Sequence, residues 1–134
     1  RVWPPSEARV IGVLDWELST LGDPLADLAY HGMAWRVPPD LWRGIGGLDL
    51  AALGIPDEAQ YLQRYASHTG RSPGALWEYY LAFNLFRMAA ILYGIAQRAA
   101  DGTAAAADAV ATGAKAGPLA ELGWQCAQRF MRQG

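Results

Sequence analysis

With 134 residues, of which 52% are hydrophobic and 11% aromatic, the chain is long enough for one globular domain with a sizeable core. Its formal net charge of −2 argues against nucleic acid and anionic membranes as partners. No apolar run comes close to the roughly 20 residues of a membrane span, and no signal peptide opens the chain. The single cysteine, Cys126, cannot form an internal disulfide, which fits a reducing compartment. We therefore expect a cytoplasmic protein with no membrane or nucleic-acid partner.

Residues 1–14 predict a short β-hairpin. Its second strand includes an apolar run from Val10 to Leu14, which ends abruptly at Asp15-Trp16-Glu17. An apolar run that polar residues stop in this way is typical of a buried strand whose far end opens on a site.

Four carboxylates lie close together after this strand: Asp15, Glu17, Asp23 and Asp27. Asp23 precedes Pro24, a pair that suits the N-cap and first position of a helix. One interpretation is structural, with Asp23 as a cap, Asp27 bonded to a nearby loop, and Asp15 and Glu17 in solvent. The other is that Asp15 ligates Mg²⁺, an ion that takes one or two carboxylates together with substrate phosphates. Spacing alone does not decide between them.

The run Val13-Leu14-Asp15-Trp16-Glu17, followed by Gly22-Asp23-Pro24 and Asp27-Leu28-Ala29, resembles the metal-binding segment of the aminoglycoside phosphotransferase and choline kinase family. The likeness is greatest to the kinase-like domains related to those fused to some acyl-CoA dehydrogenases. The family has a protein-kinase-like fold, in which this segment takes the place of the Asp-Phe-Gly motif. The resemblance implies that Asp15 binds Mg²⁺ and ATP, and that Glu17 reaches a metal-bound water. It also implies structural roles for Asp23 and Asp27, with Asp27 bonded back to the catalytic loop.

The resemblance further implies transfer of the ATP γ-phosphoryl group to a hydroxyl of a small-molecule acceptor. A kinase of this family also needs a nucleotide-covering hairpin, a strand lysine and a catalytic loop with an Asp base. In the family that loop lies just before the strand that holds Asp15, where this chain has only residues 1–14. We therefore expect the C-terminal portion of a phosphotransferase, inactive alone, whose catalytic base belongs to a missing N-terminal lobe. The alternative is a non-catalytic helical interaction module or a truncated remnant of the fold. Self-association is a further expectation.

The middle of the chain predicts helices separated by an irregular stretch. The helix that begins at Pro24 extends toward Trp35, and the glycine-rich residues 42–47 predict a flexible loop, not a phosphate site. A second helix is expected from Pro56 to His68. His31 and His68 have no second ligand at a metal-binding spacing, so a bonded or solvated histidine is the simpler interpretation.

A long helix from Gly74 to about Ala100 should form the centre of the core. Its apolar side chains recur at threes and fours, namely Trp77, Tyr80, Leu81, Leu85, Met88, Ile91, Leu92 and Ile95. Asn84 and Arg87 lie beside this stripe, and we expect them to tie the helix to the segment around Asp23 or Asp27.

Residues 103–117, rich in Ala, Gly and Thr, predict a poorly packed connection. A last helix from Pro118 would bury one face, with Cys126 as an inert core thiol. Together these patterns predict a mainly α protein, the helical C-terminal lobe of a protein-kinase-like fold with a short N-terminal β-hairpin. We divide this single partial domain into the hairpin (1–14), the metal-binding segment with its helix (15–29) and a helical substrate-side subdomain (30–134).

Overall fold

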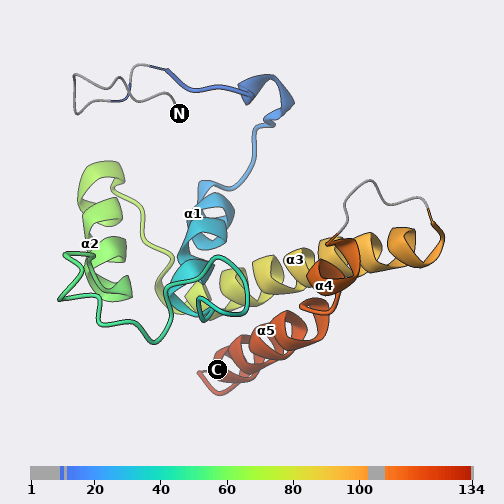
Figure 1. The fold of residues 1–134 in the computed structure, drawn as a ribbon. Helices are drawn as coiled ribbons and strands as arrows, with labels where there is room; N and C mark the ends of the chain where they lie inside the picture. The colour runs from blue at the N-terminus through green and yellow to red at the C-terminus, as the bar shows by residue number, and fades with distance from the viewer. Residues whose placement is uncertain (1–9, 11, 103–107, 134) are drawn as a thin grey trace.

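The computed structural model describes residues 10, 12–102 and 108–133 of the chain (Figure 1). In this part of the chain five α-helices are present, α1 (Pro24–Gly32), α2 (Glu58–Thr69), α3 (Trp77–Ala100), α4 (Ala109–Gly113) and α5 (Ala116–Met131). Three short 3₁₀ turns accompany them, η1 (Trp16–Leu18), η2 (Met33–Trp35) and η3 (Gly74–Leu76). The described residues form no strand beyond a single bridge at Gly12. The prediction of a mainly α fold is confirmed.

The segment before α1 runs away from the helices (Figure 1). Most of the predicted hairpin, residues 1–9 and 11, lies outside the described residues. The second strand was expected to be buried. Among its described residues this is wrong for Val13 and Leu14, which are 59% and 62% exposed. No other described element packs over these side chains, so the apolar run stays at the surface.

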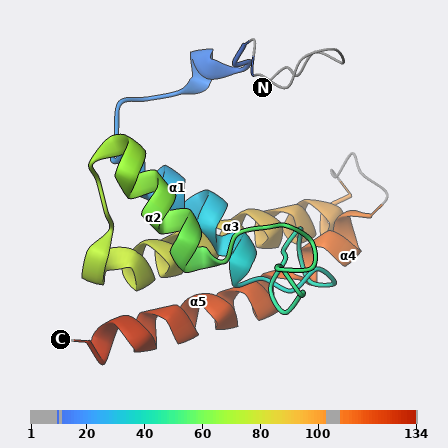
Figure 2. The same cartoon turned by 90° about the vertical axis from the view of Figure 1, so that its left-hand side faces the viewer.

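The helix α3 is the centre of the core, with α1 on one side and α4 and α5 along another (Figures 1 and 2). Its buried apolar residues include Trp77, Leu81, Leu85, Met88 and Leu92. Tyr80 and Ile95 are partly buried against this cluster, whereas Ile91 is exposed, so the predicted stripe is right except at Ile91.

The segment Gly74–Ala100 has the length and apolar composition of a membrane-spanning helix. This corrects the expectation that no run in the chain approaches such a length. The core helix of a globular domain meets the same criterion, and α3 is that core helix here. One such helix is therefore weak evidence for a membrane location, and the absence of a membrane partner stays a prediction.

Buried contacts join α1 to α3. Asn84, 1% exposed, donates from Nδ2 to the carbonyl oxygens of Ala26 in α1 and of Tyr80, both at 3.0 Å. This confirms that Asn84 ties the long helix to the start of α1. Arg87 instead lies over the ring of Tyr30, with 6.0 Å between the guanidinium carbon and the ring centroid. Arg87 thus reaches α1, but at Tyr30 and not at either acid.

The helix α2 begins and ends with strong local signals but buries none of its residues. Asp57 and Gln60 form a capping box, and Gly70 ends the helix with a positive φ of 69°. Two contacts from the η2 region hold the helix: Trp35 donates from Nε1 to the Pro56 carbonyl at 3.0 Å, and its ring stacks on Tyr61 with centroids 4.7 Å apart. The prediction of this helix is confirmed.

Two expectations about irregular segments need correction. The loop at residues 42–47 is tied to η2, because the Ile45 amide donates to the Ala34 carbonyl and the Gly46 amide to the Val37 carbonyl. Residues 103–107 lie outside the described residues, but 108–117 do not form the poorly packed connection that we expected. Ala109, Gly113 and Ala116 are buried, since small residues let α4 approach α3 closely.

Candidate functional site

Asp15 and Glu17 flank Trp16 in a turn at the exposed end of the N-terminal segment. Asp15 has a left-handed backbone, with φ 58° and ψ 23°, which Asp tolerates better than most residues. The turn closes through Ser19, whose amide and hydroxyl both donate to the Trp16 carbonyl. Within the described residues neither Asp15 nor Glu17 has a hydrogen-bond or ion-pair partner. Their carboxylates are therefore available to a ligand.

The pair has the chemistry that Mg²⁺ requires. Carboxylate oxygens are hard donors, and Mg²⁺ takes one or two of them with phosphates and waters. The described residues contain no cluster of three or more His, Cys, Asp or Glu side chains that could hold a metal ion. A cage made wholly of these side chains is thus not present here, whereas one or two exposed acids with a nucleotide phosphate would suffice for Mg²⁺.

Asp23 is held by two contacts. It accepts a hydrogen bond from the Leu25 amide at 2.9 Å, which caps α1, and a short one from the Tyr80 hydroxyl in α3. The Tyr80 bond, followed by the Leu25 amide, keeps the Asp23 pKa below its ordinary value. The same bond raises the Tyr80 pKa, because a neutral hydroxyl is the form that can donate. Asp23 therefore anchors the start of α1 to the core helix.

Asp27 lies one turn further along α1 and faces the space between α1 and α2. It lines a cavity of about 530 Å³, together with Pro24, Leu28, His31, Tyr61 and Tyr65. The ring of His31 lies 5.2 Å from that of Tyr61, so this cavity has aromatic walls and one carboxylate. Asp27 has no hydrogen bond or ion pair in the described part of the chain, and its bond to a catalytic loop stays a prediction.

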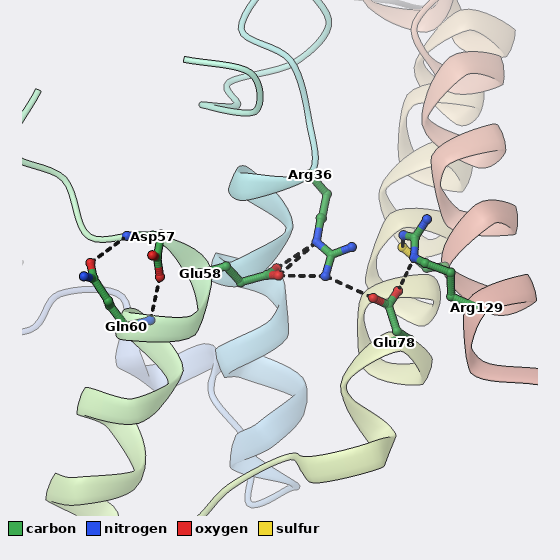
Figure 3. Close-up of polar contacts among 7 residues, drawn as sticks. Arg36, Asp57, Glu58, Gln60, Glu78 and Arg129 are labelled. Atoms are coloured by element: carbon green, nitrogen blue, oxygen red, sulfur yellow. Dashed lines mark hydrogen bonds and ion pairs between the residues drawn. The ribbon is translucent and has the colours of Figure 1, made fainter. Parts of the chain in front are cut away.

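A charged network that sequence reasoning missed runs from the start of α2 across to α3 and α5 (Figure 3). Arg36 donates to both carboxylate oxygens of Glu58, from Nε at 2.8 Å and from Nη2 at 2.6 Å. The same Nη2 lies 3.0 Å from Glu78 Oε1, and Arg129 Nε donates to Glu78 Oε2 at 3.0 Å. The Glu58 bond is the main reason that the Arg36 pKa is raised. The network joins α2, η2, α3 and α5.

No sequence pattern could have found this network. Arg36 and Glu58 are 22 positions apart, and Glu78 and Arg129 are 51 positions apart, so no helical spacing relates them. Arg129 also donates to Cys126 Sγ at 2.9 Å. The Arg129 cation lowers the pKa of the Cys126 thiol, but burial raises it by more, to about 11. This agrees with an inert core thiol.

Comparison with known proteins decides what these residues belong to. The family model for the phosphotransferase enzyme family (APH) matches residues 2–80, a range that includes Asp15, Glu17, Asp23 and Asp27. The chain belongs to the phosphotransferase enzyme family. A solved structure from Ralstonia eutropha, named as an aminoglycoside phosphotransferase, is 54% identical with a TM-score of 0.87. The match covers 95% of this chain and 39% of that one.

Curated relatives place the same segment inside much longer proteins. Acyl-CoA dehydrogenase family member 10 of Mus musculus is 42% identical over 130 residues, which cover 96% of this chain and 12% of the relative. Acyl-CoA dehydrogenase family member 11 of Homo sapiens is 36% identical over 129 residues, which cover 96% of this chain and 16% of the relative. The chain thus spans less than a fifth of these relatives. The family predicted from the motif is confirmed; the individual roles of its acids are not tested by these matches.

Proposed function

We propose that the chain is the C-terminal part of an ATP-dependent phosphotransferase that acts on a hydroxyl of a small molecule. The observation that carries this proposal is the exposed, unpartnered Asp15–Glu17 pair inside the segment that the family model matches. Asp15 would hold Mg²⁺, and Glu17 would hold a water on the ion. When bound, Mg²⁺ would neutralise charge on the transferred phosphoryl group, a main source of rate in such reactions.

The rest of the chain would position these acids and the acceptor. The Asp23–Tyr80 bond fixes the start of α1 to the core, and the segment with Asp15 leads directly into that point. The cavity that Asp27, His31, Tyr61 and Tyr65 line would receive the acceptor hydroxyl compound. The motif assigns a metal ligand but not the catalytic base, so the proposal predicts no turnover from the 134 residues alone.

The base and lysine would come from an N-terminal lobe, and the match of this chain to only 39% of the solved relative supports a larger fold. Exposed apolar side chains would form a surface on which this lobe packs. In the described structure these side chains are exposed at Val13, Leu14, Trp16 and Leu21. A second group of exposed apolar side chains lies along the edge of α3 next to α5, at Tyr79, Phe83, Phe86 and Tyr93. Self-association through these surfaces in the isolated chain follows from the same proposal, and light scattering would show it. A cytoplasmic location also stays part of the proposal.

Substitution in the full-length polypeptide tests the assignment. We expect Asp15→Asn to abolish Mg²⁺-dependent ATP turnover with the acceptor, since the variant keeps the shape of the side chain but loses the charge that holds the ion. Asp40→Asn is the matched control, because Asp40 is exposed on a loop and lies outside the motif of residues 13–29. Turnover should be unchanged in the control. Full turnover in Asp15→Asn would contradict the assignment and would favour the non-catalytic interaction module.

A further inference from the structure

A second cleft lies next to the Asp27 cavity, at the C-terminal end of α1, and His31 lines both. Its volume is about 240 Å³, and its lining comes from α1, η2, the following loop and α3. The residues that line it are Tyr30, His31, Met33, Ala34, Val37, Trp42, Arg43 and Met88. Met33, Val37 and Met88 are buried, so the floor of the cleft is apolar. Among these lining residues none is acidic.

Three cations lie against two of the aromatic rings of this cleft, and one of them, Arg43, is itself a lining residue. The guanidinium carbon of Arg43 lies 5.1 Å from the Trp42 ring centroid, and Nζ of Lys115 lies 5.3 Å from the same centroid. Arg87 lies over the ring of Tyr30, on the side of α3. Both rings line the cleft. Over residues 12–102 and 108–133 none of the three cations is paired with a carboxylate, in contrast to Arg36 and Arg129.

The backbone holds Arg43 at this position. Its φ is 45°, a conformation that residues with a side chain seldom adopt. The next residue, Gly44, lies so close to the Val37 carbonyl that a Cβ there would overlap it. The Ile45 amide then donates to the Ala34 carbonyl at 2.8 Å. Because the two residues that follow Arg43 are held against Val37 and Ala34, the Arg43 side chain starts from a defined place at the rim of the cleft.

We propose that this cleft, hereafter the basic cleft, binds an anionic amphiphile. An aliphatic chain or ring would lie on Met33, Val37 and Met88, and its carboxylate or phosphate would bind Arg43 at the rim. The charges of Lys115 at the Trp42 ring and Arg87 at the Tyr30 ring would add attraction for the anion. Unpaired cations next to buried apolar side chains suit this combination, because the head group gains charge-assisted hydrogen bonds while the tail leaves water. The proposal does not depend on phosphoryl transfer, so it can fail or hold independently of the proposed function.

Calorimetric titration of the 134-residue chain tests the basic cleft. The probes are octyl phosphate and octanoate, with octyl glucoside and octyltrimethylammonium as neutral and cationic counterparts, all below micelle formation. We expect at least one of the two anions to bind, and the neutral and cationic compounds to bind at least about tenfold more weakly, the size of one charge-assisted hydrogen bond. A preference between the two anions identifies the head group. Equal binding of all four compounds, or binding of none, would overturn the proposal.

Two pairs of substitutions locate the binding. The double variant Arg43→Gln/Lys115→Gln should lower the affinity for the anion by about tenfold or more. Arg64→Gln with Arg71→Gln removes the same charge from exposed positions on and after α2, and should leave the affinity unchanged. Ala34→Phe, which fills the cleft from η2, should abolish binding without a change of charge. Circular dichroism would verify that each variant is folded. An affinity that stays constant in both Arg43→Gln/Lys115→Gln and Ala34→Phe would contradict the assignment.

Discussion

Two acids of the N-terminal segment (residues 12–22) and one acid of the helical body differ in whether the fold supplies a partner for their charge. In the segment, Asp15 and Glu17 are exposed and have no partner among the described residues, although they belong to the family motif. In the body, Glu78 has a side chain only 10% exposed and binds Arg36 and Arg129. Charges that stabilise a fold must find partners within it, whereas charges that serve a ligand must be left without them. On the proposed function, the contrast distinguishes Glu78, which stabilises the fold, from Asp15 and Glu17, which would bind the ligand.

The largest expected effect is on the body, from Glu78→Ala. The change leaves Arg36 and Arg129 partly buried with one partner fewer, and we expect a loss of about 3 kcal/mol in the free energy of unfolding. Urea denaturation measures it. Glu121→Ala is the control, since Glu121 is exposed on α5, and it should change stability by less than about 0.5 kcal/mol. Equal losses of stability in Glu78→Ala and Glu121→Ala would contradict a stabilising role for the Glu78 ion pairs.

The next effect tests how tightly the body is packed. A Cβ at Gly113 in α4 would lie 2.8 Å from Ala96 Cα and still closer to its Cβ. We expect Gly113→Ala to destabilise the protein by about 1–3 kcal/mol. Gly94→Ala in the middle of α3 meets only the Arg98 guanidinium, at 3.6 Å, and should stabilise by about 0.5–1 kcal/mol, because alanine favours a helix. Thermal melting of the two variants should therefore shift in opposite directions, and a shared direction would contradict the packing of α4 on α3.

Asp23 lies at the boundary between the two regions and predicts a pH effect. Its pKa in the folded protein is below the ordinary value of 3.8, so its bonds to Tyr80 and Leu25 contribute stability above that value. The contribution is lost as the pH falls through the folded pKa. The melting temperature of the protein should therefore exceed that of Asp23→Asn at about pH 6, and the difference should shrink toward about pH 2. A difference that is constant with pH would mean that the carboxylate charge is not involved.

The smallest expected effect is on the segment. Asp15→Asn should change the free energy of unfolding by less than about 0.5 kcal/mol, because the carboxylate has no partner in the fold and Asn also tolerates a left-handed backbone. Chemical denaturation of the 134-residue chain measures this. A loss similar to that of Glu78→Ala would show that Asp15 stabilises the fold, and would weaken its assignment as a ligand for Mg²⁺.

Local patterns in the sequence determined the helices and the family. Asp23-Pro24 begins α1, the Asp57 and Gln60 pair begins α2, and the apolar spacing from Trp77 onward predicts the core helix. Each of these signals acts over three or four residues, so the amino acids that make it are neighbours in the chain. The phosphotransferase motif is equally local, which is why Asp15 and Glu17 could be selected without a structure.

Only the tertiary structure decided which charges find partners. The Arg36–Glu58–Glu78–Arg129 network and the basic cleft both bring together residues from distant parts of the chain, and no periodicity connects these positions. The exposure of Val13 and Leu14 was also missed because it depends on tertiary contacts. An apolar run favours burial, but it does not show whether another element packs against it. Coulomb interaction and packing depend on distance in space, and folding sets that distance independently of separation along the chain.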